Sequence, residues 1–158
     1  MDKVTGLNNR NGNQFNCAES TLLMINDKHP LPDFGPNIMK TASLTGAGLC
    51  YQGSACGAVV GMATALGLVY GTTGDESPEE YNEKREKAQG LLMPLLKEFK
   101  EKYGFINCNG LFYDIFPQDQ RTEEGEKLLN EMRAQGFPNR VCNDYVDWAA
   151  KRVLETLG

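Results

Sequence analysis

The chain lacks every short cysteine motif that identifies a common metal or redox site. No Cys-x-x-Cys pair occurs in its 158 residues, which excludes a zinc ribbon, a thioredoxin-type dithiol and a bacterial ferredoxin run. Cys-x-x-Cys-His is missing too, so the sequence excludes covalent haem attachment. Five cysteines are also too few, and odd in number, for a disulfide scaffold of this size.

Histidine and positive charge are scarce as well. His29 is the single histidine, and it lies between Lys28 and Pro30 in an expected loop. We interpret it as a surface residue, because catalysis by a pair of histidines has no support here. The formal charge of -5 argues against a nucleic-acid partner, since such affinity comes from clustered Lys and Arg.

A long uncharged stretch occupies residues 41–74, and 8 of the 17 glycines lie within it. Its apolar part, residues 55–70, is short for a bilayer, lacks basic borders and consists mostly of small residues, so we expect no membrane insertion. We predict instead a buried central helix that Ser54 caps and Gly71 ends in a left-handed conformation. Gly57 and Gly61, four residues apart, would let neighbouring helices approach closely.

Cap residues predict the other helices. Asn16 with Glu19 forms a variant capping box, and Ser77 followed by Pro78 begins a helix that stops at Gly104. Gly90 and Pro94 lie within that helix and predict a kink or break at residues 91–93. Its Lys and Glu residues between 79 and 102 predict a solvated face with i,i+4 pairs.

The last third of the chain predicts two more helices. Thr122 would begin one that Gly136 ends, and residues 139–157 have an apolar face close to a 3.6-residue period. No convincing strand pattern is present. We therefore predict an all-α fold: an N-terminal tail at residues 1–14, then one helical domain at residues 15–158, bundled around the Gly/Ala-rich central helix.

Four of the five cysteines fall at predicted helix starts: Cys17, Cys56, Cys108 and Cys142. Free backbone N–H groups and the positive end of the helix dipole favour a thiolate there, which suits metal binding. The four are far apart in sequence and would converge only through tertiary structure, as in a bundle. Cys50 is the fifth cysteine. Three interpretations of it stay open: an additional ligand, a resolving thiol or a bystander.

Other interpretations of the cysteines stay open. Residues 1–13 show no targeting signal, so we expect a cytoplasmic, reducing location in which persistent disulfides are unexpected. The thiols would then be packed core residues, or Cys50 and Cys56 would form the attacking and resolving pair of a thiol-disulfide enzyme or sensor. A third alternative is a non-catalytic binding protein with structural cysteines or zinc.

The cysteine contexts resemble a family of redox-active proteins named C_GCAxxG_C_C for its four cysteines and a Cys-Gly-Ala-x-x-Gly motif. Here the motif runs from Cys56 through Gly57 and Ala58 to Gly61. The other matching segments are Asn16-Cys17-Ala18-Glu19, Ile106-Asn107-Cys108 and Cys142 at the start of the final helix. The similarity spans about residues 15–157, and the sequence departs from it at Cys50 and in the acidic stretch at 73–86.

The resemblance implies a redox role, with an iron-sulfur cluster of unspecified nuclearity as the prosthetic group. The chain is also similar to the cluster-bearing part of split-Soret cytochromes. On this basis we expect Cys17, Cys56, Cys108 and Cys142 to hold the cluster, with Cys50 as a further candidate. Backbone N–H groups near Gly57 and Ala58 would tune its potential. A redox partner protein is expected, and the Gly-rich helix surfaces allow a homodimer.

Overall fold

The computed structural model describes residues 15–115, 122–134 and 139–158. The described residues form α-helices and no strand, which confirms the all-α prediction. The helices are α1 (Cys17–Lys28), α2 (Pro36–Cys50), α3 (Gly57–Tyr70), α4 (Pro78–Tyr103), α5 (Cys108–Ile115), α6 (Glu123–Ala134) and α7 (Asn139–Leu157). None of these helices is long and apolar enough to cross a membrane.

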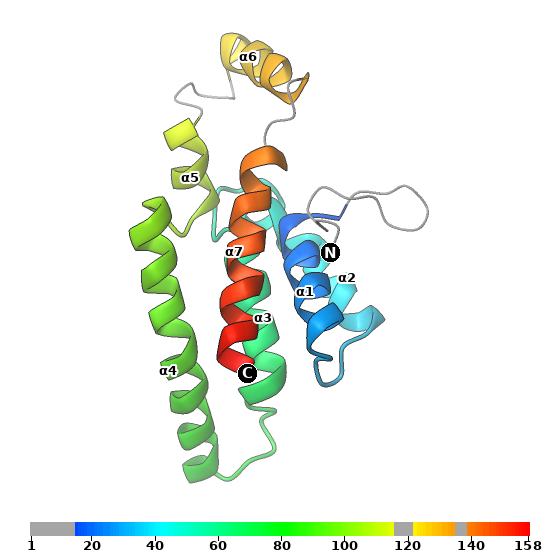
Figure 1. The fold of residues 1–158 in the computed structure, drawn as a ribbon, viewed down its shortest axis with the longest axis vertical. Coiled ribbons are helices and arrows are strands. Elements are labelled where there is room, and N and C mark those ends of the chain that lie inside the picture. Colours follow the sequence, from blue (N-terminus) through cyan, green and yellow to red (C-terminus); the bar gives the residue numbers. More distant parts are fainter. Residues whose placement is uncertain (1–14, 116–121, 135–138) are drawn as a thin grey trace.

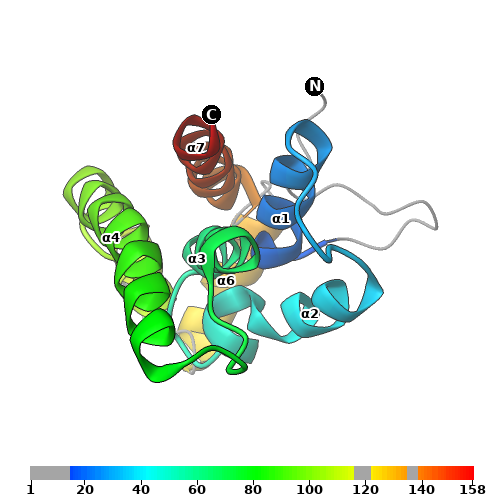
Figure 2. The ribbon, with the colours of Figure 1, turned by 90° about the horizontal axis from the view of Figure 1, so that it is seen from below.

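The Gly/Ala-rich helix α3 lies at the centre of the bundle, as predicted. Seen along its axis, it is surrounded by α1, α2, α4 and α7 (Figure 2). A side chain at Gly61 would come within 3.0 Å of the Ala18 carbonyl oxygen and the Thr21 side chain. Glycine therefore allows α1 and α3 to pack almost backbone to backbone, which draws the residues before both helices together.

Three helices of the bundle start at the same end of the molecule. In Figure 1, α1, α3 and α7 all run downward, while α4 runs upward and delivers the chain to the start of α5 at the upper end. Because a helix dipole is positive at its N-terminus, these parallel starts gather positive ends and free N–H groups in one region. The four predicted helix-start cysteines lie at or next to the starts of α1, α3, α5 and α7.

Most of the predicted caps are present. Asn16 and Glu19 form a complete capping box at α1, the Ser77 side chain accepts from the Glu80 N–H, and the Thr122 hydroxyl accepts from the Gly125 N–H. The final helix has the predicted bounds. Gly136, the predicted end of α6, lies outside the described residues.

The ends of α3 correct two predictions. Its N-cap is Cys56 rather than Ser54, because the residues before Cys56 are held in an extended bridge between Ala55 and Asn107. Gly71 follows the helix with φ -70° and ψ 171°, which is extended and not left-handed. Glycine is needed at position 71 for room, since a Cβ there would lie 3.1 Å from the Gly67 carbonyl carbon.

Helices α4 and α2 differ from what the sequence indicates. Helix α4 continues without a break through Gly90 and Pro94, because its Leu95 and Phe99 are buried against the bundle and hold the helix in place. Its exposed face carries the predicted i,i+4 pairs Lys84–Glu80 and Lys97–Glu101. Helix α2 was not predicted at all, since it has no side-chain cap and no charge in its second half.

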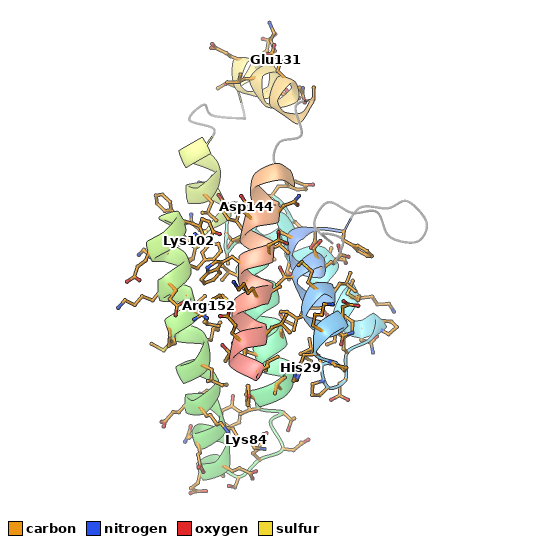
Figure 3. All side chains as sticks on the ribbon, viewed as in Figure 1. His29, Lys84, Lys102, Glu131, Asp144 and Arg152 are labelled. Carbon is orange, nitrogen blue, oxygen red and sulfur yellow. The ribbon has the colours of Figure 1, made fainter. Side chains whose placement is uncertain are left out.

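An aromatic seam joins α4 to α7. The ring of Phe99, which is fully buried, lies 5.8 Å from Tyr145 and 5.5 Å from Trp148, and Tyr103 lies 4.7 Å from Tyr145 (centroid distances). One turn after Trp148 on α7, Arg152 (labelled in Figure 3) donates two hydrogen bonds of 2.9 and 3.0 Å to the Glu98 carboxylate. Each such ring pair contributes about 0.5–1.5 kcal/mol beyond the area it buries.

Candidate redox site at the helix starts

Cys17 is the first residue of α1, directly after the N-cap Asn16. Its carbonyl oxygen accepts a 2.8 Å hydrogen bond from the Thr21 hydroxyl. A Cβ at Gly57 would collide with the Cys17 sulfur and lie 3.2 Å from its Cβ. The glycine of the Cys-Gly-Ala motif therefore provides the space that the sulfur of a different cysteine occupies.

Cys56 and Cys108 are joined through the backbone. The Cys56 N–H donates to the Ile106 carbonyl at 2.8 Å, and the Cys108 N–H donates to the Ser54 carbonyl at 2.7 Å. These bonds lie on either side of the antiparallel bridge between Ala55 and Asn107. They fix the N-cap of α3 beside the first residue of α5, two positions far apart in the sequence.

Cys142 completes the group from the far end of the chain. It is the fourth residue of α7, in the first turn, and α7 packs against both α1 and α3. The sulfur lies close enough to Cys17, Cys56 and Cys108 for each to oppose its ionisation. The structure thus brings together Cys17, Cys56, Cys108 and Cys142, which we call the four-cysteine group.

Three thiols of this group, those of Cys56, Cys108 and Cys142, have pKa values above that of a free cysteine. Burial, together with the neighbouring Cys17 and Cys108, raises the pKa of Cys56 to about 12. Burial likewise raises the pKa of Cys108 and, more strongly, of Cys142. The backbone N–H groups of Ala58 and Val59 favour the Cys56 thiolate, but this effect is smaller. The prediction that helix starts would lower these pKa values is wrong, because desolvation outweighs the dipole.

Cys50 is separate from the four-cysteine group. It is exposed, and its sulfur donates to the Leu44 carbonyl at 3.2 Å. It lies in a turn of five consecutive residues with positive φ, which runs from Ala47 to Tyr51. Such left-handed turns cost about 1–2 kcal/mol for each residue that is not glycine.

The left-handed turn contacts the group through Gly48, one of its residues. A Cβ at Gly48 would lie 2.5 Å from the Cβ of Cys108, so the turn packs directly against the start of α5. The Gly48 carbonyl also accepts from the Ser54 N–H at 2.9 Å. The sequence marks this stretch as glycine-rich, and the Gly46-x-Gly48 spacing is its one signal of close packing.

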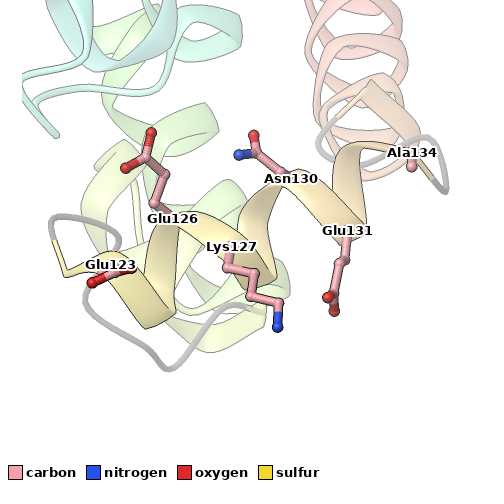
Figure 4. A pocket seen from close by; sticks show the side chains of 6 residues that line it. All are labelled: Glu123, Glu126, Lys127, Asn130, Glu131 and Ala134. Atoms are coloured by element: carbon pink, nitrogen blue, oxygen red, sulfur yellow. The ribbon is translucent and has the colours of Figure 1, made fainter.

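Other candidate positions lie elsewhere. His29 follows the last residue of α1, at the opposite end of the helix from Cys17 (Figure 3). An open depression of about 540 Å³ lies on α6, and its lining comes from that helix alone (Figure 4). In the part of the chain that the structure describes, no set of three or more His, Cys, Asp and Glu side chains is arranged to hold a single metal ion.

Comparison with known proteins identifies the family of the chain. No curated protein and no solved structure matches the chain. A family model does match, and it covers residues 15–156, a segment that contains α1 to α6 and all of α7 except its last residue. This confirms the resemblance seen in the cysteine contexts. The chain belongs to the family described as Putative redox-active protein (C_GCAxxG_C_C).

Proposed function

We propose that the protein binds an iron-sulfur cluster through Cys17, Cys56, Cys108 and Cys142 and transfers electrons to or from a partner protein. The observation that carries this proposal is the convergence of four cysteines from four helix starts into one group, in which Cys56 is buried and the other three are half-buried. A bound cluster supplies one-electron chemistry, with a potential set by cluster type, burial and hydrogen bonds to sulfur. The redox class of the family agrees with this role.

The donor set suits an iron-sulfur cluster in its chemistry. All four side chains are thiols, which are the usual ligands of such clusters. The helix starts supply N–H groups and positive dipole ends, and those of Ala58 and Val59 already favour the Cys56 thiolate. A group that carries several negative sulfurs is stabilised by this arrangement.

Zinc is the alternative metal for the same four thiols, because four cysteines also form a common structural zinc site. Metal analysis distinguishes the two, since a cluster contains iron and sulfide and a zinc site contains neither.

The thiol-disulfide alternative receives less support. An attacking cysteine needs a thiolate at physiological pH and access to its substrate. Cys56 is only 5% exposed and its pKa is raised, so it is a poor attacking or resolving thiol. Cys50 is accessible, but its thiol donates a hydrogen bond to the carbonyl oxygen of Leu44. Neither cysteine of this pair shows the environment of a catalytic dithiol.

Anaerobic purification with iron and acid-labile sulfide analysis tests the proposal. We expect a coloured protein with iron and sulfide in equal amounts. Cys56→Ser should lose the iron, whereas the matched variant Cys50→Ser should keep it, because Cys50 lies outside the group. A colourless wild-type protein that cannot be reconstituted would overturn the proposal, and equal iron loss in both variants would overturn the ligand assignment.

A further inference from the structure

The side chain of Asn16 bonds to two separate elements. Its Oδ1 accepts from the Glu19 N–H at 2.9 Å and caps α1. Its Nδ2 donates to the carbonyl oxygens of Ala42 and Ser43 at 3.0 and 3.1 Å, which lie on α2. An N-cap needs only the first of these bonds. The two donations by Nδ2 therefore serve a purpose beyond helix capping.

The α2 side of this junction leads to a second cysteine. Gly46, at the end of the regular part of α2, packs so closely on Asn16 that a Cβ would lie 2.6 Å from the Asn16 Cβ. Two residues later Gly48 packs on the Cβ of Cys108. Contacts thus run without a gap from Asn16 through this short segment to Cys108, while Cys17 follows Asn16 directly.

We propose that Asn16 is a positioning residue that fixes Cys17 relative to Cys108. Its Oδ1 orients the start of α1, and its Nδ2 fixes the segment that packs on Cys108. The inference rests on the proposed function for its consequence in the cluster-bound protein. The positioning itself is a property of the polypeptide and is measurable without the cluster.

Two variants separate capping from positioning. Asn16→Asp keeps an oxygen that caps α1 but replaces the Nδ2 donor with an oxygen facing two carbonyls. Asn16→Ser also caps a helix well, is uncharged and is too short to reach α2. The matched control is Asn26→Asp on the same helix, where Asn26 Oδ1 accepts from the Leu31 N–H at 2.9 Å and Asp keeps that acceptor.

The first measurement uses the metal-free protein. In a Cys50→Ser background, dibromobimane, a reagent that bridges two nearby thiols, should link Cys17 to Cys108, as mapped by mass spectrometry. We expect the yield of this bridge to fall in both Asn16 variants and to stay unchanged in Asn26→Asp, with helix content by circular dichroism preserved. Wild-type bridging in the Asn16 variants, or an effect of Asn16→Asp alone, would overturn the proposal.

The second measurement uses the reconstituted protein. Residues that orient metal ligands typically change metal affinity by about 10–100-fold when replaced, so we expect a chelator to remove iron at least about tenfold faster from both Asn16 variants. The two readouts fail separately. Bridging that depends on Asn16 in a protein that binds no iron would refute the cluster and keep the positioning role, whereas iron release equal to wild type would refute that role.

Discussion

The aromatic seam between α4 and α7 is stabilised differently from the end of the molecule that holds the four-cysteine group, which we call the cysteine end. At the seam, aromatic ring contacts and the bidentate ion pair between Arg152 and Glu98 join helices α4 and α7. At the cysteine end, the segments are joined by the backbone bridge between Ala55 and Asn107. They also pack closely at Gly48 and Gly57, where the Cβ of any other residue would clash. Side-chain contacts therefore stabilise the seam, whereas close backbone packing at glycines shapes the cysteine end.

This difference separates stability from function. Burying Phe99 and its neighbours removes apolar area from water and stabilises the fold. In the four-cysteine group, neighbouring thiols oppose the ionisation of Cys56, Cys108 and Cys142, and the adjoining left-handed turn is strained. The metal-free cysteine end therefore contributes little stability, and its geometry is maintained by the packing of the helices behind it.

The largest expected effect comes from the seam. Phe99→Ala should lower the free energy of unfolding by about 3–5 kcal/mol, because Phe99 is fully buried and touches three other rings. Urea denaturation measures this. The matched control Phe105→Ala removes the same side chain where it is 45% exposed and should cost far less. Equal losses would show that the seam does not carry the stability assigned to it.

Adding a methyl group at Gly57, in the cysteine end, should lower stability less than Phe99→Ala does and should act directly on the Cys17 thiol. Gly57→Ala would push a Cβ into the Cys17 sulfur and should cost about 1–3 kcal/mol, as overpacking does. Gly67→Ala on the same helix meets nothing within 4 Å and should be neutral or stabilising by up to about 1 kcal/mol. If both variants unfold at the same urea concentration, the glycine is not reserving space.

Alkaline pH should weaken the cysteine end selectively. The Cys56 pKa rises on folding from 9.0 to about 12, so the folded protein holds that proton more tightly than the unfolded chain does. Its contribution to stability is intact below pH 9.0 and is lost as the pH rises toward about 12, by about 1.4 kcal/mol per pH unit. Urea denaturation of the reduced, metal-free protein at a series of pH values should show a shallower decline in Cys56→Ala. Identical declines would contradict the burial of this thiol.

Local chemistry in the sequence predicted much of the fold. Caps at Asn16, Ser77 and Thr122, and the apolar period of the last helix, determined helix starts because each is satisfied within a few residues. The placement of four cysteines at helix starts followed from the same signals. Their convergence did not, because it depends on how α1, α3, α5 and α7 pack.

The errors came from tertiary effects that a sequence window does not contain. Ser54 resembles a cap, but its N–H and carbonyl are bonded to Gly48 and Cys108, so the chain is still extended there. Pro94 favours a break, yet the burial of Leu95 and Phe99 keeps α4 continuous. Helix starts favour thiolates, but burial of the sulfurs reversed the direction of the pKa shifts.

The four-cysteine group also has a consequence for the order of events during synthesis. Its members lie on the first helix and the last, with Cys17 and Cys142 separated by most of the chain. A growing polypeptide therefore lacks the fourth thiol of the group until α7 has left the ribosome and docked against α1 and α3. Any prosthetic group that needs all four sulfurs is therefore bound only after α7 has been synthesised.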